Sequence, residues 1–266
     1  MADHAELLPL AREAVAMARA IIRSRAPRSV VAKGDRDLVT DIDLAVEEAV
    51  RDFLLRETPE IGVLGEEHGR TGTDALWWAL DPVDGTSNFA RGVPLCAVSL
   101  GLVDGRRGVL AAIDLPFLDV TYSAADGQGA FADDERIGVS GVTGLHDAVI
   151  SVGDFAVGGD AAAEARNRVR LALLEDLGAR AQRIRMIGTA AIDLAWVAQG
   201  RFDATVILSN RPWDTAAGVV LVREAGGTVL DHDGGDHTTD SQVTVAVTPG
   251  LRDEIMTSLG SAYAAA

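Results

Sequence analysis

The sequence has very little cysteine and almost no lysine. Cys96 is the single cysteine among 266 residues, so an intramolecular disulfide and a zinc cluster of several thiolates are excluded. Of the 24 lysines and arginines, only Lys33 is a lysine. No apolar run approaches the roughly 20 residues of a membrane-spanning helix, and the N-terminus lacks a signal-peptide pattern. We therefore expect a soluble protein of the cytoplasm.

Positive charge is scarce as well. Forty acidic residues against 24 Lys and Arg give a formal net charge of −16. Such a chain has no general basic face for nucleic acid or for an anionic membrane, so we expect neither as a partner. Hydrophobic residues make up 48%, which is too many for a disordered acidic chain and enough for a large core.

The first half of the chain predicts two helices followed by strands. Apolar residues at helical spacing predict a helix over residues 5–26. A second helix is predicted to begin at Thr40, with Asp43 as its capping-box partner, and to end at Thr58-Pro59. The pattern then changes to a meander of mostly antiparallel strands. The predicted strands are Leu76–Leu80, Leu95–Val103, Gly108–Ile113 and Asp119–Ser123.

The second half alternates strands and helices, which is typical of an α/β layer. Its predicted strands are Ala148–Val152, Arg180–Ile187, Phe202–Leu208, Val229 and Val243–Val247. Its predicted helices are Ala161–Leu177, ending at Gly178, then Thr189–Gln199, Trp213–Ala225 and residues 250–259. No linker or internal repeat separates residues 1–145 from residues 146–266, so we expect the two halves to pack as one domain over residues 1–266.

Acidic residues gather in three clusters where core or turn residues would be expected. The most informative cluster follows a predicted buried strand, where Asp81 and Asp84 flank Pro82 on one tight turn. Two carboxylates so close repel each other unless a cation lies between them, and Mg²⁺ prefers carboxylate oxygens. The backbone N–H groups and hydroxyls of the following Gly85–Asn88 suit a phosphate. The clusters are Gly65–Gly69, Trp78–Phe89 and Arg211–Gly218.

Five sequence blocks together resemble the inositol monophosphatase family of Mg²⁺-dependent, lithium-sensitive phosphatases. They occur in family order over most of the chain, from Lys33 to Gly227. The blocks are Asp37–Thr40 with Asp43, Gly65–Glu67, Asp81–Phe89, Gly188–Ala191 and Trp213–Gly218. The resemblance implies an α/β (α+β) fold, the layered αβαβα sandwich of this family, with the site between the two halves.

The resemblance also implies roles for individual residues. Two or three Mg²⁺ ions per site would be held by Glu66, Asp81, the carbonyl of Val83, Asp84 and Asp214. Asp43 and Thr86, together with Glu66, would act in catalysis by orienting and activating the water that attacks phosphorus in line. The substrate-binding residues implied are Gly85, Thr86, Ser87, Thr189, Ala190, Asn210, Arg211 and Asp214. Family members commonly form homodimers, so a homodimer is expected by analogy.

The substrate is expected to be a small phosphorylated metabolite: a polyol, sugar, histidinol or nucleotide phosphate. An ungapped count back from Asp214 places Ile207 where inositol-specific relatives have an acid that contacts the polyol, which argues against inositol phosphate. A histidinol-phosphate or nucleotide phosphatase is therefore an alternative. A different class of function, a non-catalytic binding or regulatory protein on the same frame, would be favoured by loss of metal ligands, and none is lost.

Simpler interpretations stay open at several positions. Glu66 and Glu67 fit a solvated turn, Asp214 fits a helix N-cap, and Lys33 fits either a site lysine or a leftover surface cation. Asp231–Asp236 fits a polar turn better than a calcium loop, because the acid at the twelfth position is missing. The arginines at 166, 168, 170, 180 and 183 are most simply a solvated face or an oligomer contact.

Overall fold

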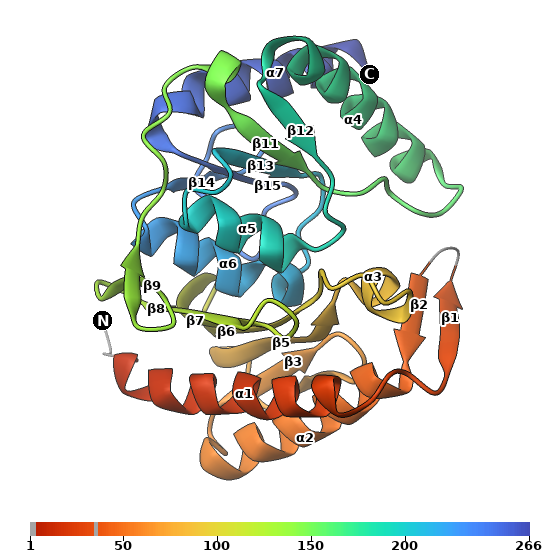
Figure 1. The fold of residues 1–266 in the computed structure, drawn as a ribbon, viewed down its shortest axis with the longest axis vertical. Helices are drawn as coiled ribbons and strands as arrows, with labels where there is room; N and C mark the ends of the chain where they lie inside the picture. The colour runs from red at the N-terminus through yellow and green to blue at the C-terminus, as the bar shows by residue number, and fades with distance from the viewer. Residues whose placement is uncertain (1–3, 35–36) are drawn as a thin grey trace.

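Helices and sheets alternate in layers through the molecule. The computed structural model describes residues 4–34 and 37–266. From the bottom of Figure 1 upward, an eight-stranded sheet follows a first helix pair, and a five-stranded sheet separates a second pair from a third. The pairs are α1 (Leu8–Ser24) with α2 (Asp41–Glu57), α5 (Ala190–Ala198) with α6 (Pro212–Glu224), and α4 (Ala161–Arg180) with α7 (Arg252–Ala265). This order confirms the predicted αβαβα sandwich.

The eight-stranded sheet has the strand order β10-β9-β8-β7-β6-β5-β3-β4. The pairs from β5 to β10 are antiparallel, as the predicted meander requires, whereas β3 runs parallel to β5. Four of its strands coincide with predicted ones: β5 (Leu76–Asp84), β6 (Ala97–Asp104), β7 (Arg107–Leu115) and β8 (Val120–Ala125). The others are short: β3 (Gly62–Gly65), β4 (Gly69–Thr71), β9 (Gly129–Ala132) and β10 (Glu135–Ile137).

The five-stranded sheet has the order β12-β11-β13-β15-β14. Its β11 lies parallel to β12 and β13, and β15 lies antiparallel to β13 and β14. Its strands are β11 (Val149–Val152), β12 (Arg183–Arg185), β13 (Ala204–Ile207), β14 (Thr228–Leu230) and β15 (Thr244–Val247).

An exposed hairpin and four short helices complete the chain. The hairpin pairs β1 (Val30–Gly34) with β2 (Asp37–Thr40). The sequence did not predict it, because β1 is exposed along its whole length and has no alternation of apolar and polar residues. The short helices are η1 (Ala5–Leu7), α3 (Thr86–Ala90), η2 (Leu145–Asp147) and η3 (Pro249–Leu251). Among the described residues, none of the helices is long and apolar enough to cross a membrane.

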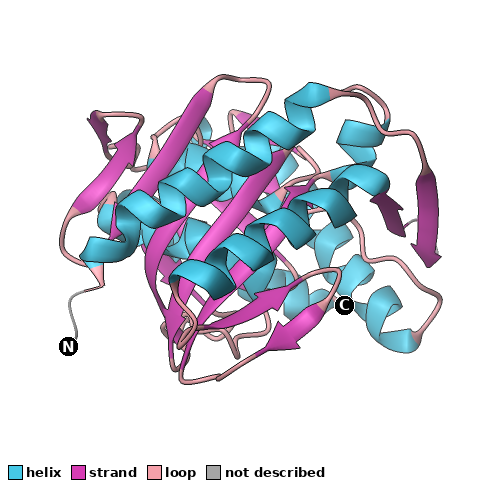
Figure 2. Cartoon of the chain, turned by 90° about the horizontal axis from the view of Figure 1, so that it is seen from below, coloured by secondary structure: helices cyan, strands magenta, loops and turns pink. Residues whose placement is uncertain are grey.

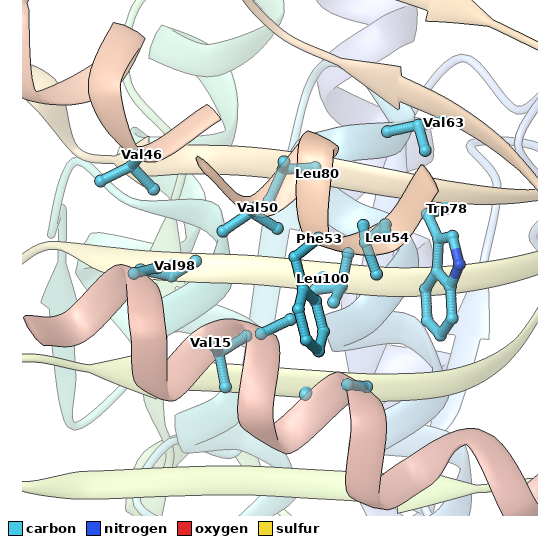
Figure 3. Packing of buried hydrophobic residues seen from close by; sticks show 14 of the residues in the cluster. Val15, Val46, Val50, Phe53, Leu54, Val63, Trp78, Leu80, Val98 and Leu100 are labelled. Atoms are coloured by element: carbon cyan, nitrogen blue, oxygen red, sulfur yellow. The ribbon is translucent and has the colours of Figure 1, made fainter. Parts of the chain in front are cut away.

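The core beside the site lies between the first helix pair and the eight-stranded sheet. Seen from below, α1 and α2 lie across one face of this sheet (Figure 2). Figure 3 shows Val50, Phe53 and Leu54 of α2 in one buried cluster with Trp78 and Leu80 of β5. Each fully buried side chain of this size stabilises the fold by about 1.5–3 kcal/mol. The packing therefore fixes β5, whose last residues carry acids.

Several predicted boundaries are wrong. The strand predicted over Leu76–Leu80 continues to Asp84, because a bulge between Asp81 and Asp84 keeps the pairing with β6. The helix expected to end at Gly178 continues to Arg180, whose guanidinium pairs with Asp176 and Glu254. The strand predicted over 180–187 is correspondingly short, and the last helix extends to Ala265.

Candidate active site

The predicted metal ligands lie in one electrostatic environment although they come from three separate segments. Asp81 is 3% exposed. Its burial, followed by the negative charges of Glu66, Asp84 and Asp214, raises its pKa well above the usual range for an aspartate. Four carboxyl groups separated by up to 148 residues along the sequence therefore influence each other directly.

The bulge at the end of β5 orients its two aspartates differently. The N–H of Val83 donates to Asp81 Oδ1 at 3.0 Å, so this aspartate turns back on its own loop. Asp84 Oδ2 instead accepts hydrogen bonds from Thr189 Oγ1 and from the N–H of Ala191, both at 2.6 Å. These two donors belong to the start of α5, where the sequence predicted a helix to begin, and Thr189 is the N-cap of that helix. Asp84 thus joins the two halves of the chain.

Burial dominates the acidity of Asp84. Its pKa is raised to about 7 by desolvation, even though the hydrogen bonds from Thr189 and Ala191 act in the opposite direction. The charges of Glu66 and Asp154 raise it further. A carboxyl group in this position binds a cation favourably, because the cation compensates the desolvated negative charge.

Asp43 serves both the cap of α2 and the site. Its Oδ2 accepts from the backbone N–H of Thr40 at 3.1 Å and from the Thr40 hydroxyl, and these bonds confirm the predicted capping box. Its Oδ1 accepts from Thr86 Oγ1 at 2.9 Å. The Thr86 hydroxyl also lies 3.0 Å from the carbonyl oxygen of Val83. Helix capping leaves one oxygen of Asp43 directed at the threonine that the family resemblance places beside the reacting water.

Gly85 connects β5 to α3 and has a left-handed backbone with φ of +90°. A Cβ atom there would lie 3.0 Å from the carbonyl oxygen of Leu95, so a side chain would be strained in both conformation and space. Gly85 is the N-cap residue of α3, and Ser87 is exposed in its first turn. The glycine therefore allows the chain to turn sharply directly after Asp84.

Sequence reasoning missed the residues that hold the Glu66 turn. Glu47 of α2 is fully buried, and its carboxylate accepts the backbone N–H groups of Glu67 at 2.7 Å and of His68 at 2.9 Å. Arg51, one turn later, donates to Glu47 at 2.9 Å and to the carbonyl of Gly69 at 2.7 Å. The available signal was an acid–arginine pair at positions i and i+4 among the apolar residues of this helix.

The close approach of Glu47 also explains a neighbouring glycine. A Cβ atom on Gly65 would lie 2.1 Å from Glu47 Oε1, so a larger residue would displace the carboxylate. The β3–β4 turn that presents Glu66 and Glu67 is consequently fastened to α2 by two backbone hydrogen bonds and a buried ion pair. We call Glu47 and Arg51 the turn clamp.

Lys33 contacts the acids of this turn. Its Nζ donates to Glu66 Oε1 at 2.9 Å and to Glu67 Oε1 at 2.8 Å. Partial burial acts to lower the pKa of Lys33, but the bonds to the two glutamates outweigh it and raise the pKa above the usual lysine value. Of the two interpretations left open by the sequence, the structure supports the site lysine.

Asp214 lies in the first turn of α6, and the N-cap of this helix is Arg211. The interpretation of Asp214 as an N-cap is therefore wrong, because Pro212 occupies the first helical position and the cap lies three residues before Asp214, at Arg211. Burial, then the charges of Asp84 and Glu66, raises the pKa of Asp214 well above its usual range, while Arg211 acts to lower it. Asp214 thus faces the same group of acids as Asp81.

The donor chemistry of this group fits Mg²⁺. Buried carboxylates that raise each other's pKa carry surplus negative charge, and hard oxygen ligands are those that Mg²⁺ prefers. The same residues do not form a tight set of ligand atoms. Among the described residues, Asp231, His232 and Asp233 are the one group whose possible ligand atoms all lie within 4.8 Å of one another.

A cavity of about 890 Å³ borders the site on the side of Asp214. Asn210 and Arg211 line it, as do Asp154 and Phe155 of the loop after β11. The Asn210 amide is already used structurally, since it donates to the carbonyls of Thr238 and Ser241 and accepts from Thr215 Oγ1. Its predicted contact with substrate stays a prediction, as does that of Ala190.

Ile207 lies at the end of β13 and is only 6% exposed. Its side chain belongs to the hydrophobic cluster around α5 and α6, and it is not part of the cavity wall. The described cavity wall therefore has no acid at the position reached by the ungapped count. The next residues, Leu208 and Ser209, do line the cavity.

Comparison with known proteins identifies the family. The family model described as "Inositol monophosphatase family" matches residues 3–262. The inositol-1-monophosphatase ImpA of Mycolicibacterium smegmatis is 38% identical over 86% of this chain and 82% of its own. The Nus factor SuhB of Xylella fastidiosa is 37% identical over 78% of this chain and 74% of its own.

A solved structure shares the whole fold. The extragenic suppressor protein suhB from Bartonella henselae superposes with a TM-score of 0.89 at 33% identity, covering 96% of this chain and 98% of its own. The family match extends over both halves and includes every block quoted from the sequence. The chain belongs to the inositol monophosphatase family, a family of phosphatases.

Proposed function

We propose that the protein is a Mg²⁺-dependent phosphomonoesterase that hydrolyses a small phosphorylated metabolite by in-line attack of water. The observation that supports this most is the surplus of buried carboxyl groups at the end of β5. Asp81, Asp84 and Asp214 all have raised pKa values because they are desolvated and close to other acids. Bound cations would keep these acids ionised, and phosphate ester hydrolysis uses cations.

In this proposal Glu66, Asp81, Asp84, Asp214 and the carbonyl of Val83 hold two or three Mg²⁺ ions. When bound, the ions would lower the pKa of the attacking water and stabilise the leaving oxygen.

The remaining steps are assigned to other groups of the chain. The Thr86 hydroxyl, hydrogen-bonded to Asp43 Oδ1, orients the water, and Asp43 accepts its proton. The backbone N–H groups at Gly85 and Thr86 bind phosphate oxygens, with Ser87 and Thr189 beside them.

The alcohol part of the substrate lies in the cavity beside Asp214, where Asn210 and Arg211 form part of the wall. The relative from Mycolicibacterium smegmatis is an inositol-1-monophosphatase, so inositol 1-phosphate is one test substrate. The described cavity wall offers only two acids, Asp154 and Asp214, and four arginines. Four arginines would repel the ammonium group of histidinol, so this composition favours sugar or nucleotide phosphates over histidinol phosphate.

A second candidate function is regulatory binding of a partner or phosphorylated ligand without turnover. It is favoured by one observation, the 37% identity with a relative named Nus factor. Retention of every proposed metal ligand favours the enzyme.

We also propose a cytoplasmic homodimer. Exposed apolar side chains lie near a smaller cavity of about 280 Å³ lined by Ile22 and Pro27, and these residues suit a subunit contact. The exposed fractions are 38% for Val93, 41% for Phe117 and 38% for Leu118. Light scattering coupled to size-exclusion chromatography tests the dimer, and a monomer at micromolar concentration would contradict it.

The test of the proposed function is phosphate release from a panel of phosphomonoesters, with Mg²⁺ and with a chelator. The panel includes inositol 1-phosphate, histidinol phosphate, fructose 1,6-bisphosphate and adenosine monophosphates. We expect Mg²⁺-dependent release from at least one member. No release from any member by a folded protein with measurable Mg²⁺ binding would favour the regulatory function instead.

A further inference from the structure

The cavity beside Asp214 differs in charge from the rest of the chain. Its wall includes four arginines and two aspartates, whereas the whole sequence has 24 Lys and Arg against 40 Asp and Glu. Three of the arginines come from the first half of α4, and the fourth precedes α6. They are Arg166, Arg168, Arg170 and Arg211. Positive charge is therefore concentrated next to the site of an otherwise acidic protein.

These arginines do not share one structural role. Arg170 is 2% exposed; its Nε donates to the carbonyl of Gly153 at 2.8 Å, and its Nη1 donates to Asn167 Oδ1 at 2.9 Å. Asn167 in turn bonds both the N–H and the carbonyl of Ala156. Arg170 and Asn167 thus fasten the loop after β11 to α4, which gives the cavity a fixed wall.

Arg166 and Arg211 have guanidinium groups that the fold does not use. Within the described ranges 4–34 and 37–266, neither side chain forms a hydrogen bond or an ion pair with an acid, although Arg211 influences the charge of Asp214. Other arginines of this chain, such as Arg51 and Arg223, pair with acids at 2.9 and 2.7 Å. A guanidinium on a cavity wall with its donors unused is suited to bind an anion in bidentate fashion.

We propose that this cavity binds a second anionic group, a phosphate or a carboxylate, on the alcohol part of the substrate, with Arg166 and Arg211 as its ligands. The proposal rests on the proposed phosphatase function, because the cavity borders the reacting centre through Asp214. It narrows the substrate class from any small phosphomonoester to one with a further negative charge. Arg166 and Arg168 are exposed, as the solvated-face interpretation expects, whereas Arg170 is buried; all three line the cavity.

The geometry separates this second group from the phosphate that is hydrolysed. Asp214 belongs both to the acids around Asp81 and to the cavity wall, so it marks the boundary between the two. Arg166 lies on α4, which belongs to the outer helix layer, and Arg211 lies at the start of α6. An anion between them would therefore be bound from both the inner and the outer helix layers.

The experiment compares matched substrates that differ only in a second anion. Phosphate release in Mg²⁺ is measured for fructose 1,6-bisphosphate against fructose 1-phosphate, and for 2-phosphoglycerate against glycerol 2-phosphate. We expect kcat/KM to be at least about tenfold higher for the partner with the second anionic group in one pair, as one charge-assisted contact provides. The pair that shows the preference distinguishes a phosphate from a carboxylate. Equal kcat/KM within both pairs would overturn the proposal while leaving the phosphatase intact.

Two variants and one control assign the preference to residues. Arg166→Gln should reduce the preference about tenfold, mainly through KM, with little change for the partner that lacks the second anion. Arg211→Gln should also reduce the preference about tenfold, and it should weaken turnover of both partners because Arg211 lies close enough to Asp214 to influence its charge. The control is Arg183→Gln, because Arg183 is exposed on β12, lies outside the cavity wall and donates to the carbonyl of Gln182. A preference that survives both cavity variants, or that falls equally in the control, would contradict the assignment. Absence of phosphate release from every substrate would instead reject the proposed function itself.

Discussion

Two groups of acids in this molecule look alike in the sequence and differ in every physical respect. At Asp231, burial acts to raise the pKa, but backbone N–H groups and His232 outweigh it and lower the pKa to about 2. Its oxygens accept from the N–H groups of His232 at 2.7 Å, Gln242 at 3.1 Å and Val243 at 3.0 Å. At Asp84, two donors do not outweigh burial, and the pKa is raised to about 7.

The difference shows that proximity of acids does not by itself mark a metal site. The possible ligand atoms of Asp231, His232 and Asp233 lie within 4.8 Å of one another. The Asp231 carboxylate, however, already accepts hydrogen bonds from the backbone N–H groups of its own turn and of Gln242 and Val243, which precede β15. Asp81, Asp84 and Asp214 are more dispersed but have surplus charge in a desolvated place. Surplus negative charge, and not closeness, is what attracts a cation.

The largest expected effect concerns turnover. Asp84→Asn should reduce kcat by about 10³-fold or more, because it removes charge from the proposed metal cluster. Folding should be retained, since the substitution preserves side-chain volume and removes a desolvated charge. Steady-state phosphate release and thermal unfolding measure the two effects. Near-normal turnover of Asp84→Asn would show that the metal assignment is wrong.

The turn clamp should have the next largest effect. Glu47→Gln places an amide N–H₂ where a carboxylate oxygen now accepts a backbone N–H, and it breaks the buried pair with Arg51. We expect a loss of about 3 kcal/mol in the free energy of unfolding and a rise of about tenfold in the Mg²⁺ concentration needed for half-maximal activity. The matched control is Glu48→Gln on the exposed side of the same helix. Equal behaviour of the two variants would contradict the positioning role.

The region around Asp231 should respond to pH through His237. Burial, then the charge of Arg223, lowers the pKa of His237 to about 4, although Asp231 and Asp236 act to raise it. Because the folded pKa lies below the unfolded one, the contribution of His237 is complete above pH 6.5 and is lost as pH falls toward 4. The expected loss is about 3 kcal/mol at pH 4.

Urea unfolding of the wild type and of His237→Gln over this pH range measures that loss. The difference in unfolding free energy between them should shrink as the pH falls, since the variant has no group to protonate. Parallel pH profiles would show that His237 is not the titrating group.

The smallest effect is expected for Asp231→Asn, the counterpart of Asp84→Asn in the other group of acids. Asp231→Asn should reduce the free energy of unfolding by about 1–3 kcal/mol, because one carboxylate oxygen that accepts backbone N–H groups becomes a donor. It should leave kcat and the Mg²⁺ requirement unchanged. Chemical unfolding and the Mg²⁺ titration are compared for both Asp→Asn variants. A higher Mg²⁺ requirement in Asp231→Asn than in the wild type would contradict the distinction between the two groups of acids.

Local signals in the sequence predicted much of this structure. The capping box of Thr40 with Asp43 and the N-cap at Thr189 depend on residues within one turn of each other, and both are present. The antiparallel meander could be predicted from the sequence because its central strands are long and apolar. The β1–β2 hairpin and the turn clamp were missed. Strand β1 is fully exposed, and Glu47 contacts Glu67 across 20 residues.

The sequence by itself determined the types of most elements, the order of the acidic blocks and the family. Only the tertiary structure decided which acidic side chains receive enough hydrogen bonds to offset their burial. Thr189 donates to Asp84 across 105 residues, and the arginine-lined cavity joins α4 to the start of α6. The physical reason is that capping and helix periodicity depend on neighbours along the chain, whereas desolvation depends on segments that meet only after folding.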